Sequence, residues 1–179
     1  MSHVSCWPAG RDDLSSHFAI RHQVFVEEQA VMVFTDVDDL DRQPNTIHVL
    51  AASGNELAGA VRLYQLDESG LWKGDRLSVL PDHRTSTVGV RLVRFAVATA
   101  AAAGGSVMEA TVQVPNTRFF ERLGWQRDGA IATHFGIPHQ PMVIDLPGAM
   151  TEHSEVPDAP ELHFPITPQA PSPLLSPVV

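Results

Sequence analysis

The chain has 179 residues, 44% of them hydrophobic, which suits one domain with one sizeable core. Its net charge of -9 argues against nucleic acid or an anionic membrane surface as the main partner, because both require clustered cations. A single cysteine, Cys6, excludes an internal disulfide and any multi-cysteine metal site, and no apolar run is long enough to span a bilayer. We therefore expect a cytoplasmic protein.

The first predicted elements are a strand and a helix. The strand covers His3–Trp7 and ends where a proline and a glycine follow. We expect Cys6 within this strand to be a small buried apolar residue rather than a nucleophile. Asp12 or Asp13 then caps a helix that ends near Gln29.

The segment after this helix, Thr35–Arg42, is rich in carboxylates. It contains Asp36, Asp38, Asp39 and Asp41. Such a run is most often a solvated loop, and this is what we expect. The alternative is that these side chains present negative charge to a cationic substrate.

Three β-rich runs follow. Ile47–Ala52 and Leu57–Leu66 are separated by a short Gly-containing turn, which predicts a hairpin. A second turn leads into a third strand over Leu71–Leu80. The next element is a helix from Val88, because apolar residues recur there at helical spacing until two consecutive glycines, 104–105, end it.

The turn between this strand and this helix is a candidate anion site. Ser86 or Thr87 can cap the helix, whose first backbone N–H groups and positive dipole end converge on one spot. From Lys73 to Arg94 there are five Lys or Arg against two Asp, in a chain of net charge -9. The site therefore suits a phosphate or pyrophosphate. The alternative is an ordinary strand–helix connection with a solvated arginine face.

The next part of the chain predicts three more strands and a short helix. Apolar and polar residues alternate over Val107–Val114, which indicates a strand with one polar face. Asn116 then caps a short helix. Trp125–Phe135 and Gln140–Leu146 are the last predicted strands, joined by a turn over 136–139.

We predict one domain over residues 1–146 and a tail over 147–179. The last 33 residues hold 8 of the 14 prolines, four acidic residues and no Lys or Arg. This composition is typical of an extended or disordered segment. The alternative is a tail that docks into a groove through its apolar residues.

Two segments carry a resemblance to a known family. Arg84–Gly89 (RTSTVG) is similar to the R/Q-x-x-G-x-G/A pyrophosphate loop, and Asn116–Trp125 (NTRFFERLGW) to the N-x-x-x-x-F/Y-x-x-x-G-F segment, of the GNAT superfamily of acetyl-CoA-dependent acyltransferases. Thr87 stands where the first loop glycine is usual, which narrows the room for a phosphate but adds a hydroxyl donor. The resemblance implies the GNAT fold, of α/β (α+β) class, with a mixed sheet of about six to seven strands flanked by helices.

The resemblance also implies acetyl-CoA as the acyl donor and no metal. Its diphosphate would lie on the loop and its pantetheine arm along the strand before it, where backbone N–H groups polarise the thioester carbonyl. The residues expected to bind it are Leu77, Ser78, Val79, Arg84, Thr85, Ser86, Thr87, Val88, Gly89, Val90, Asn116, Phe119 and Phe120.

Within the superfamily, two further segments indicate a branch. Arg21–Gln29 (RHQVFVEEQ) is similar to the first helix of a branch that includes acyl-homoserine-lactone synthases and small acetyltransferases. With its late GIPHQPM segment, the chain resembles the nitrogen-starvation acetyltransferases of that branch.

The lactone synthases also share four residues with this chain, Arg21, Phe25, Arg62 and Arg76, which the resemblance implies lie at the acceptor site. The glutamate that those enzymes carry three positions before the strand arginine is Lys73 here. Lactone synthesis also needs a basic docking face for an acyl carrier protein, which an acidic chain provides poorly. Acetylation of a small-molecule amine is therefore the favoured activity.

Three carboxylates are candidates for the group that deprotonates the amine: Glu109, Glu28 and Asp75. We rank Glu109 first, because it lies on the polar face of the strand next to the expected cofactor strand. The alternatives are a helix-end charge for Glu28, an ion-pair partner of Arg62 or Arg76 for Glu109, and a strand-edge charge for Asp75.

The acid that protonates the leaving thiolate is harder to assign. In the family this is usually a tyrosine on the short helix, but here Phe119 and Phe120 fill that place. Water, His134 or His139 are the remaining candidates, with His139 expected on a turn between two strands. The histidines lack the spacing of a zinc motif, so we expect no metal site.

The expected partners are acetyl-CoA and a small-molecule amine, with no nucleic acid and no membrane; whether the protein forms a homodimer is open. A different class of function fits the same fold. The missing tyrosine leaves room for a non-catalytic acyl-CoA sensor or assembly subunit.

Overall fold

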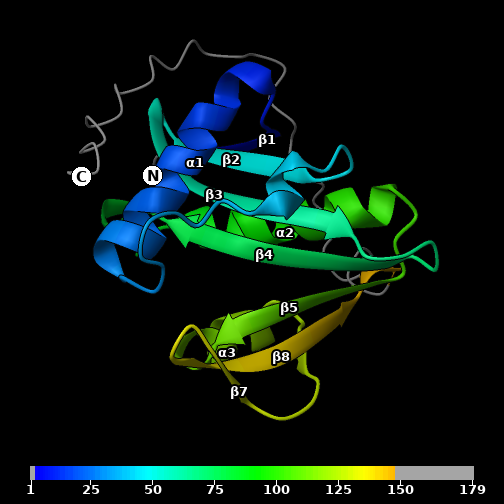
Figure 1. Cartoon of the computed structure of the whole chain (residues 1–179). Coiled ribbons are helices and arrows are strands. Elements are labelled where there is room, and N and C mark those ends of the chain that lie inside the picture. Colours follow the sequence, from blue (N-terminus) through cyan, green and yellow to red (C-terminus); the bar gives the residue numbers. More distant parts are fainter. Residues whose placement is uncertain (1–2, 148–179) are drawn as a thin grey trace.

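Alternating apolar segments assemble into one mixed sheet with helices on both faces, over the described residues 3–147 (Figure 1). The strands are β1 (Val4–Pro8), β2 (Ile47–Ser53), β3 (Glu56–Gln65), β4 (Leu71–Val79), β5 (Val107–Gln113), β6 (Gln126–Arg127), β7 (Ala132–His134) and β8 (Ile137–Asp145). The helices are α1 (Leu14–His22), α2 (Val88–Ala102) and α3 (Thr117–Glu121). This arrangement confirms the α/β class that was expected.

The sheet order is β1-β2-β3-β4-β5-β8-β6, with β7 paired to β8. The pairs β1-β2, β2-β3 and β3-β4 are antiparallel, β5 is parallel to β4, and β8 is antiparallel to β5. Two parallel strands that follow each other in the chain need a connection that crosses over the sheet, and α2 provides it between β4 and β5. The sheet has eight strands rather than about six to seven, because the predicted strand over Trp125–Phe135 is divided into β6 and β7.

Residues of β2 alternate between two cores. Val49 and Ala51 belong to the large core beneath α2, whereas Leu50 and Ala52 pack with Ile20 of α1. A strand that is buried on both faces needs a continuous apolar run, which the sequence supplies here. Cys6 of β1 is also buried, as expected, and burial raises the pKa of its thiol to about 12.

The first helical run ends at Glu28, next to the predicted Gln29, but its second part is not an α-helix, and the last turn lies elsewhere than predicted. After α1 the chain continues as a π-helix over Gln23–Glu28, a form often found at functional sites. The turn expected over 136–139 lies earlier: Phe135 (φ 52°) and Gly136 (φ 76°) form it, and β8 begins at Ile137. His139 is therefore a strand residue and not the turn residue that was expected.

Helix α1 is anchored to the sheet by a buried histidine. The ring of His17 is fully buried, and its Nε2–H donates to the Val61 carbonyl at 3.2 Å. Burial lowers the pKa of His17 to about 3.

This burial predicts a pH dependence of stability. The unfolded chain binds the His17 proton near pH 6.5 and the folded chain near pH 3, so stability falls as pH drops from 6.5 towards 3, by on the order of 1 kcal/mol per pH unit. Urea unfolding of wild type and His17→Gln at pH 7.5, 6 and 5 should show a shallower slope for the variant. Burial also lowers the pKa of His48, so some slope remains. Equal slopes would contradict the assignment.

No helix within residues 3–147 has the length and apolar character needed to cross a membrane. The predicted tail over 147–179 lies outside the described residues, apart from Pro147.

Candidate active site

Strands β4 and β5 form a V-shaped opening in the sheet. They pair only from Leu71–Gly74 to Val107–Ala110, and Figure 1 shows them separating beyond that point. Two residues after the last pair, Arg76 adopts a left-handed conformation (φ 52°), and the β3–β4 register shifts between Ala60 and Arg62. A bulge of this kind bends a strand and turns its pairing groups away from a neighbour. The bulge therefore coincides with the start of the opening.

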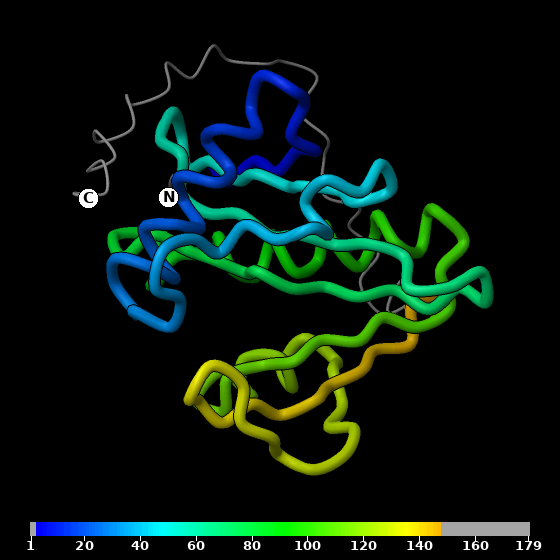
Figure 2. The backbone as a smooth tube through the Cα atoms, viewed as in Figure 1, coloured from blue at the N-terminus to red at the C-terminus, as the bar shows by residue number. Residues whose placement is uncertain are grey.

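A pocket of about 370 Å³ occupies this opening. Its walls come from β4, β5, α2 and α3, and it is closed at the sides by the segment after α1 and by the β7–β8 turn, which face each other across the open end in Figure 2. Most of the lining is apolar and includes Phe25, Val31, Met32, Leu77, Val112, Phe120, Trp125 and Phe135. The polar lining residues include Lys73, Asp75, Arg76, Thr111, Gln113, Asn116, His134 and His139.

Four backbone amides converge at the start of α2. Within the described chain, the N–H groups of Thr85, Thr87, Gly89 and Val90 donate to no acceptor. The loop caps the other amides in this stretch itself, those of Arg84, Ser86 and Val88. Free amides at a helix N-terminus bind a diphosphate well, because the helix dipole adds to their hydrogen bonds.

The neighbourhood of Gly89 joins three of the predicted cofactor segments. A Cβ on Gly89 would lie 3.4 Å from Cζ of Phe119 and 3.7 Å from Cγ2 of Val79, so the ends of β4 and α3 both contact the start of α2. Asn116, Phe120 and Leu77 line the pocket. Ser78 is buried, its hydroxyl donates to the Ala60 carbonyl of β3, and it is not among the residues that line the pocket.

Arg84 and Glu28 bind each other. The Arg84 guanidinium donates to both Glu28 oxygens, at 2.5 and 2.6 Å, and its Nε donates to the Val79 carbonyl at 2.9 Å. This hydrogen bonding lowers the pKa of Glu28, which weakens it as a proton acceptor. The pair fixes the loop to the end of the first helix, so the Arg84 side chain is already engaged and Glu28 lies outside the pocket lining.

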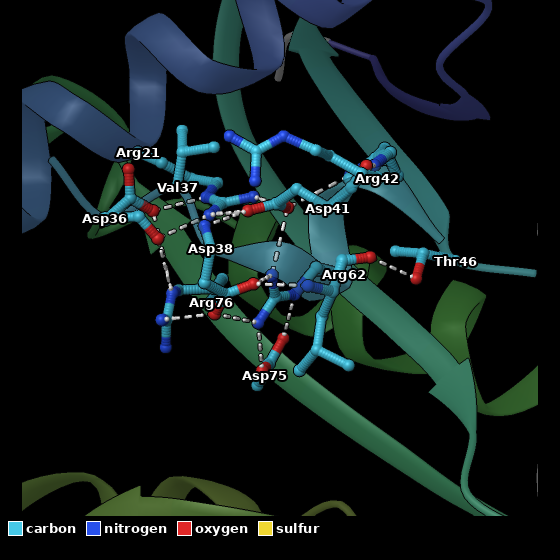
Figure 3. Close-up of polar contacts among 12 residues, drawn as sticks. Arg21, Asp36, Val37, Asp38, Asp41, Arg42, Thr46, Arg62, Asp75 and Arg76 are labelled. Carbon is cyan, nitrogen blue, oxygen red and sulfur yellow. Dashed lines mark hydrogen bonds and ion pairs between the residues drawn. The ribbon is translucent and has the colours of Figure 1, made fainter. Parts of the chain in front are cut away.

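An arginine–aspartate cluster connects the segment that follows the first helix to α1, β3 and β4 (Figure 3), and two of its members, Asp75 and Arg76, line the pocket. Its members are Arg21, Arg62, Arg76, Asp36, Asp38, Asp41 and Asp75. The side chains of Asp36 and Asp41 are almost fully buried, and Arg62 donates to Asp38 at 2.6 Å. The expected solvated loop is therefore wrong for these aspartates, because three arginines from α1, β3 and β4 neutralise them. Only Asp39 has the exposed position that was expected.

The cluster determines the charge state of its members. Burial by itself raises the pKa of Asp41, but hydrogen bonds from Arg21 and from the Asp38 amide, with the charges of Arg21 and Arg62, hold it well below its usual value. Arg21 and Arg62 have no exposed side-chain surface and do not line the pocket, so direct contact with a substrate does not follow from this geometry. Of the four predicted acceptor-site residues, Phe25 and Arg76 line the pocket.

The other two predicted carboxylates are also ion-paired. Both oxygens of Asp75, which lines the pocket, accept from Arg62 at 2.6 and 2.7 Å. Glu109 accepts from Lys73 at 3.0 Å and is not part of the pocket lining. Its partner is thus Lys73, rather than Arg62 or Arg76.

Two histidines do face the pocket. His134 of β7 and His139 of β8 both line it, and their rings meet edge to face with centroids 5.5 Å apart. Among residues 3–147 there is no group of three or more His, Cys, Asp or Glu side chains arranged to hold a metal ion. Sequence reasoning missed Trp125 and Phe135 as lining residues, because nothing in their spacing shows which face they take.

The family model described as "Acetyltransferase (GNAT) family" matches residues 11–125, which include the opening between β4 and β5 and the amides at the start of α2. The chain belongs to the GNAT acetyltransferase family. This GNAT protein is 29% identical over 135 residues to the "Uncharacterized N-acetyltransferase YjcF" of Bacillus subtilis (strain 168), covering 75% of this chain and 94% of that one.

Solved structures share the fold of this GNAT protein. An acyl-CoA N-acyltransferase from Pseudomonas aeruginosa matches with a TM-score of 0.69 and 22% identity, covering 80% of this chain and 99% of that one. The CoA-dependent acyl-homoserine lactone synthase BjaI, solved with SAM and isopentyl-CoA, matches with a TM-score of 0.67 and 19% identity, covering 85% and 89%. Both likenesses concern the fold, so the substrates must be argued from the site.

Proposed function

We propose that this GNAT protein is an N-acetyltransferase that moves the acetyl group of acetyl-CoA to the amine of a small molecule by direct attack. The observation that carries the proposal is the set of free amides of Thr85, Thr87, Gly89 and Val90 beside an apolar pocket in a split sheet. These two features suit the two ends of one donor, a diphosphate and an acyl-pantetheine arm.

The residues present fit acetyl-CoA in two ways. Four of the seven amides from Arg84 to Val90 are free to donate to a diphosphate, whereas the other three are bonded within the loop. Thr87, an exposed residue, adds a hydroxyl group. The separated strands leave a passage between Leu77 on β4 and Asn116 and Phe120 on the other side, all of which line the pocket. A pantetheine arm is a chain of amides and methylene groups, so a narrow, partly apolar passage suits it.

The chemistry requires little of the protein beyond position and proton transfer. An amine attacks a thioester directly, so no enzyme nucleophile is needed. The protein must hold both substrates, stabilise the negative charge that develops on the thioester oxygen, and accept a proton from an ammonium group. Backbone N–H groups of β4 next to the bulge at Arg76 are our candidates for the second task.

We propose an acceptor with an apolar body rather than a polycation. The aspartates that hinted at a cationic acceptor are bound to Arg21, Arg62 and Arg76, so they offer little free negative charge. The side walls of the pocket are instead formed by Phe25, Val31, Met32 and Phe135. Burying such surfaces against an apolar group contributes roughly 25 cal/mol per Å².

The finer placement rests on sequence motifs. The Arg21–Gln29 and Gly136–Met142 segments support the nitrogen-starvation subgroup, and the single cysteine supports the proposed cytoplasmic location. Lactone synthesis stays less favoured, because Lys73 occupies the position of the expected glutamate and pairs with Glu109.

A calorimetric titration and a thiol-release assay test the proposal. We expect the full chain to bind acetyl-CoA with a Kd on the order of 1 to 100 μM, within the usual range for enzyme substrates. A panel of phenethylamine, L-leucine, spermidine and S-adenosylmethionine should then release free CoA fastest with phenethylamine, with the acetylated amine identified by mass spectrometry.

Results of these two assays that differ from the expected one would indicate a different function or a different acceptor. Binding of acetyl-CoA without turnover of any amine would replace the enzyme with an acyl-CoA sensor. Lactone formation from S-adenosylmethionine would identify a lactone synthase. Turnover of spermidine alone would keep the enzyme but overturn the apolar acceptor.

A further inference from the structure

We propose that His139 is the general base that takes a proton from the acceptor ammonium and returns it to the leaving thiolate. This inference rests on the proposed acetyl transfer and names the residue that handles its proton. Three observations carry it: the hydrogen bond of the ring, its place in the sheet, and the ion pairs of every competing carboxylate.

One hydrogen bond fixes the tautomer of His139. Its Nδ1 lies 2.8 Å from the carbonyl oxygen of Ile137, and a carbonyl oxygen can only accept, so Nδ1 must carry the hydrogen. In a neutral imidazole the other nitrogen, Nε2, then holds the lone pair. Because His139 lines the pocket, this tautomer leaves Nε2 as the ring nitrogen that can accept a proton from a group bound there. The edge-to-face contact with His134 restrains the ring plane.

The sheet register places His139 at the level of the bulge in β4. Gly74 of β4 pairs with Ala110 of β5, so Leu77 and Gln113, three residues further along each strand, lie at the same level. His139 is the partner of Gln113 in the β5–β8 pairing. Leu77, the proposed pantetheine contact, and His139 thus come from strands on opposite sides of the opening, and both line the pocket.

The competing carboxylates are occupied. Glu28 is bound by Arg84, both oxygens of Asp75 are bound by Arg62, and Glu109 is bound by Lys73. His134 also lines the pocket, but it forms no ring hydrogen bond among the described residues that would fix its tautomer.

The charged and titratable groups around His139 are few. Lys73, Asp75 and Arg76 of β4 and His134 of β7 line the same pocket, and the residues of β5, α2 and α3 that line it carry no titratable side chain. A pH profile of the reaction can therefore be assigned to a small set of groups.

The proton steps balance. Nε2 of His139 takes one proton from the R–NH₃⁺ group, which frees the nitrogen lone pair. That lone pair forms the C–N bond to the acetyl carbon as the C–S bond breaks, and the imidazolium of His139 gives its proton to the departing sulfur. A second proton of the nitrogen leaves to solvent, so that R–NH₃⁺ and the thioester become the amide, CoA–SH and one H⁺.

The test compares His139→Gln with a control, His22→Gln. The control makes the same substitution at a partly exposed histidine that does not line the pocket. With phenethylamine and acetyl-CoA at pH 7, we expect kcat of H139Q to fall by about 100- to 1,000-fold, the usual contribution of a general base. The Kd for acetyl-CoA from calorimetry should stay within about twofold of wild type. The loss of kcat in H139Q should become smaller as the pH approaches the pKa of the amine in solution, because more of the amine is then already deprotonated. Added imidazole should restore part of the rate of H139Q. H22Q should retain its rate.

The outcomes separate this inference from the function on which it rests. If wild type acetylates the amine and H139Q keeps its rate within about threefold, His139 is not the base and the acetyltransferase stands. If His134→Gln shows the large loss instead, the base is His134 and this assignment is overturned. If wild type binds acetyl-CoA but acetylates no amine, both proposals fail.

Discussion

Replacing Thr87 with aspartate should abolish most of the acetyl-CoA affinity while leaving the fold intact. Thr87 precedes the first residue of α2 and makes no side-chain cap. An aspartate there is a good cap, because its carboxylate accepts from the free Val90 amide and complements the helix dipole. The same carboxylate occupies a diphosphate donor and repels the diphosphate. Calorimetry should show a Kd at least about 100-fold weaker than wild type, which corresponds to roughly 2.7 kcal/mol.

Two further measurements keep this prediction specific. Thr87→Asn caps the same amide without a charge, so we expect a loss of about tenfold or less. Thermal melting of Thr87→Asp should give a midpoint equal to or above that of wild type, which excludes misfolding. Acetyl-CoA binding by Thr87→Asp within about threefold of wild type would show that the diphosphate lies elsewhere.

The arginine–aspartate cluster should carry the largest stability effect in the chain. Arg62 is fully buried and pairs with Asp38, Asp41 and Asp75. Arg62→Met keeps most of the side-chain volume but leaves three carboxylates without their shared partner. Removing one member of a buried ion pair costs about 3 to 5 kcal/mol, which should lower the melting midpoint by roughly 6 to 20 °C.

A matched control is available in the same cluster region. Arg42 pairs with Asp39 at 2.7 Å, but both side chains are largely exposed, so Arg42→Met should cost less than about 0.5 kcal/mol. A similar loss in the two variants at pH 7 would contradict the buried-network account.

Acid should weaken the cluster of the wild-type protein. The pKa of Asp38 and that of Asp41 are both lowered: burial opposes the shift, but hydrogen bonds and charges from Arg62 and Arg21 outweigh it. A lowered folded pKa gives stability that is complete above the unfolded value, near 3.9, and is lost as pH falls below it. The difference between wild type and Arg62→Met should therefore shrink in that range.

The sequence allowed the sheet, α2 and the pyrophosphate loop to be predicted because each has a local signal. Alternation marks β5, whose Met108, Ala110 and Val112 are buried, and helical spacing marks α2, whose Val88, Leu92 and Ala96 are buried. The free amides at the loop follow from the same logic, since the first turn of any helix lacks acceptors.

Long-range features of the site had no such signal. Asp36 and Asp38 contact arginines on α1, β3 and β4 that lie up to 40 positions away along the chain. Counting the charges within a short stretch of sequence cannot detect such contacts. The left-handed Arg76 was also unexpected, because a positive φ on arginine is unfavourable unless the fold enforces it. The shift of His139 from a turn into β8 arose because Phe135 and Gly136, rather than the later proline, make the turn.

The most direct test of the account is a calorimetric comparison of acetyl-CoA with S-acetylpantetheine, which has the same thioester arm but lacks the diphosphate and the adenosine 3′-phosphate attached to it. If the amides of Thr85, Thr87, Gly89 and Val90 hold the diphosphate, S-acetylpantetheine should bind the full chain at least about 100-fold more weakly. Equal affinities for the two compounds would contradict a diphosphate site at the start of α2.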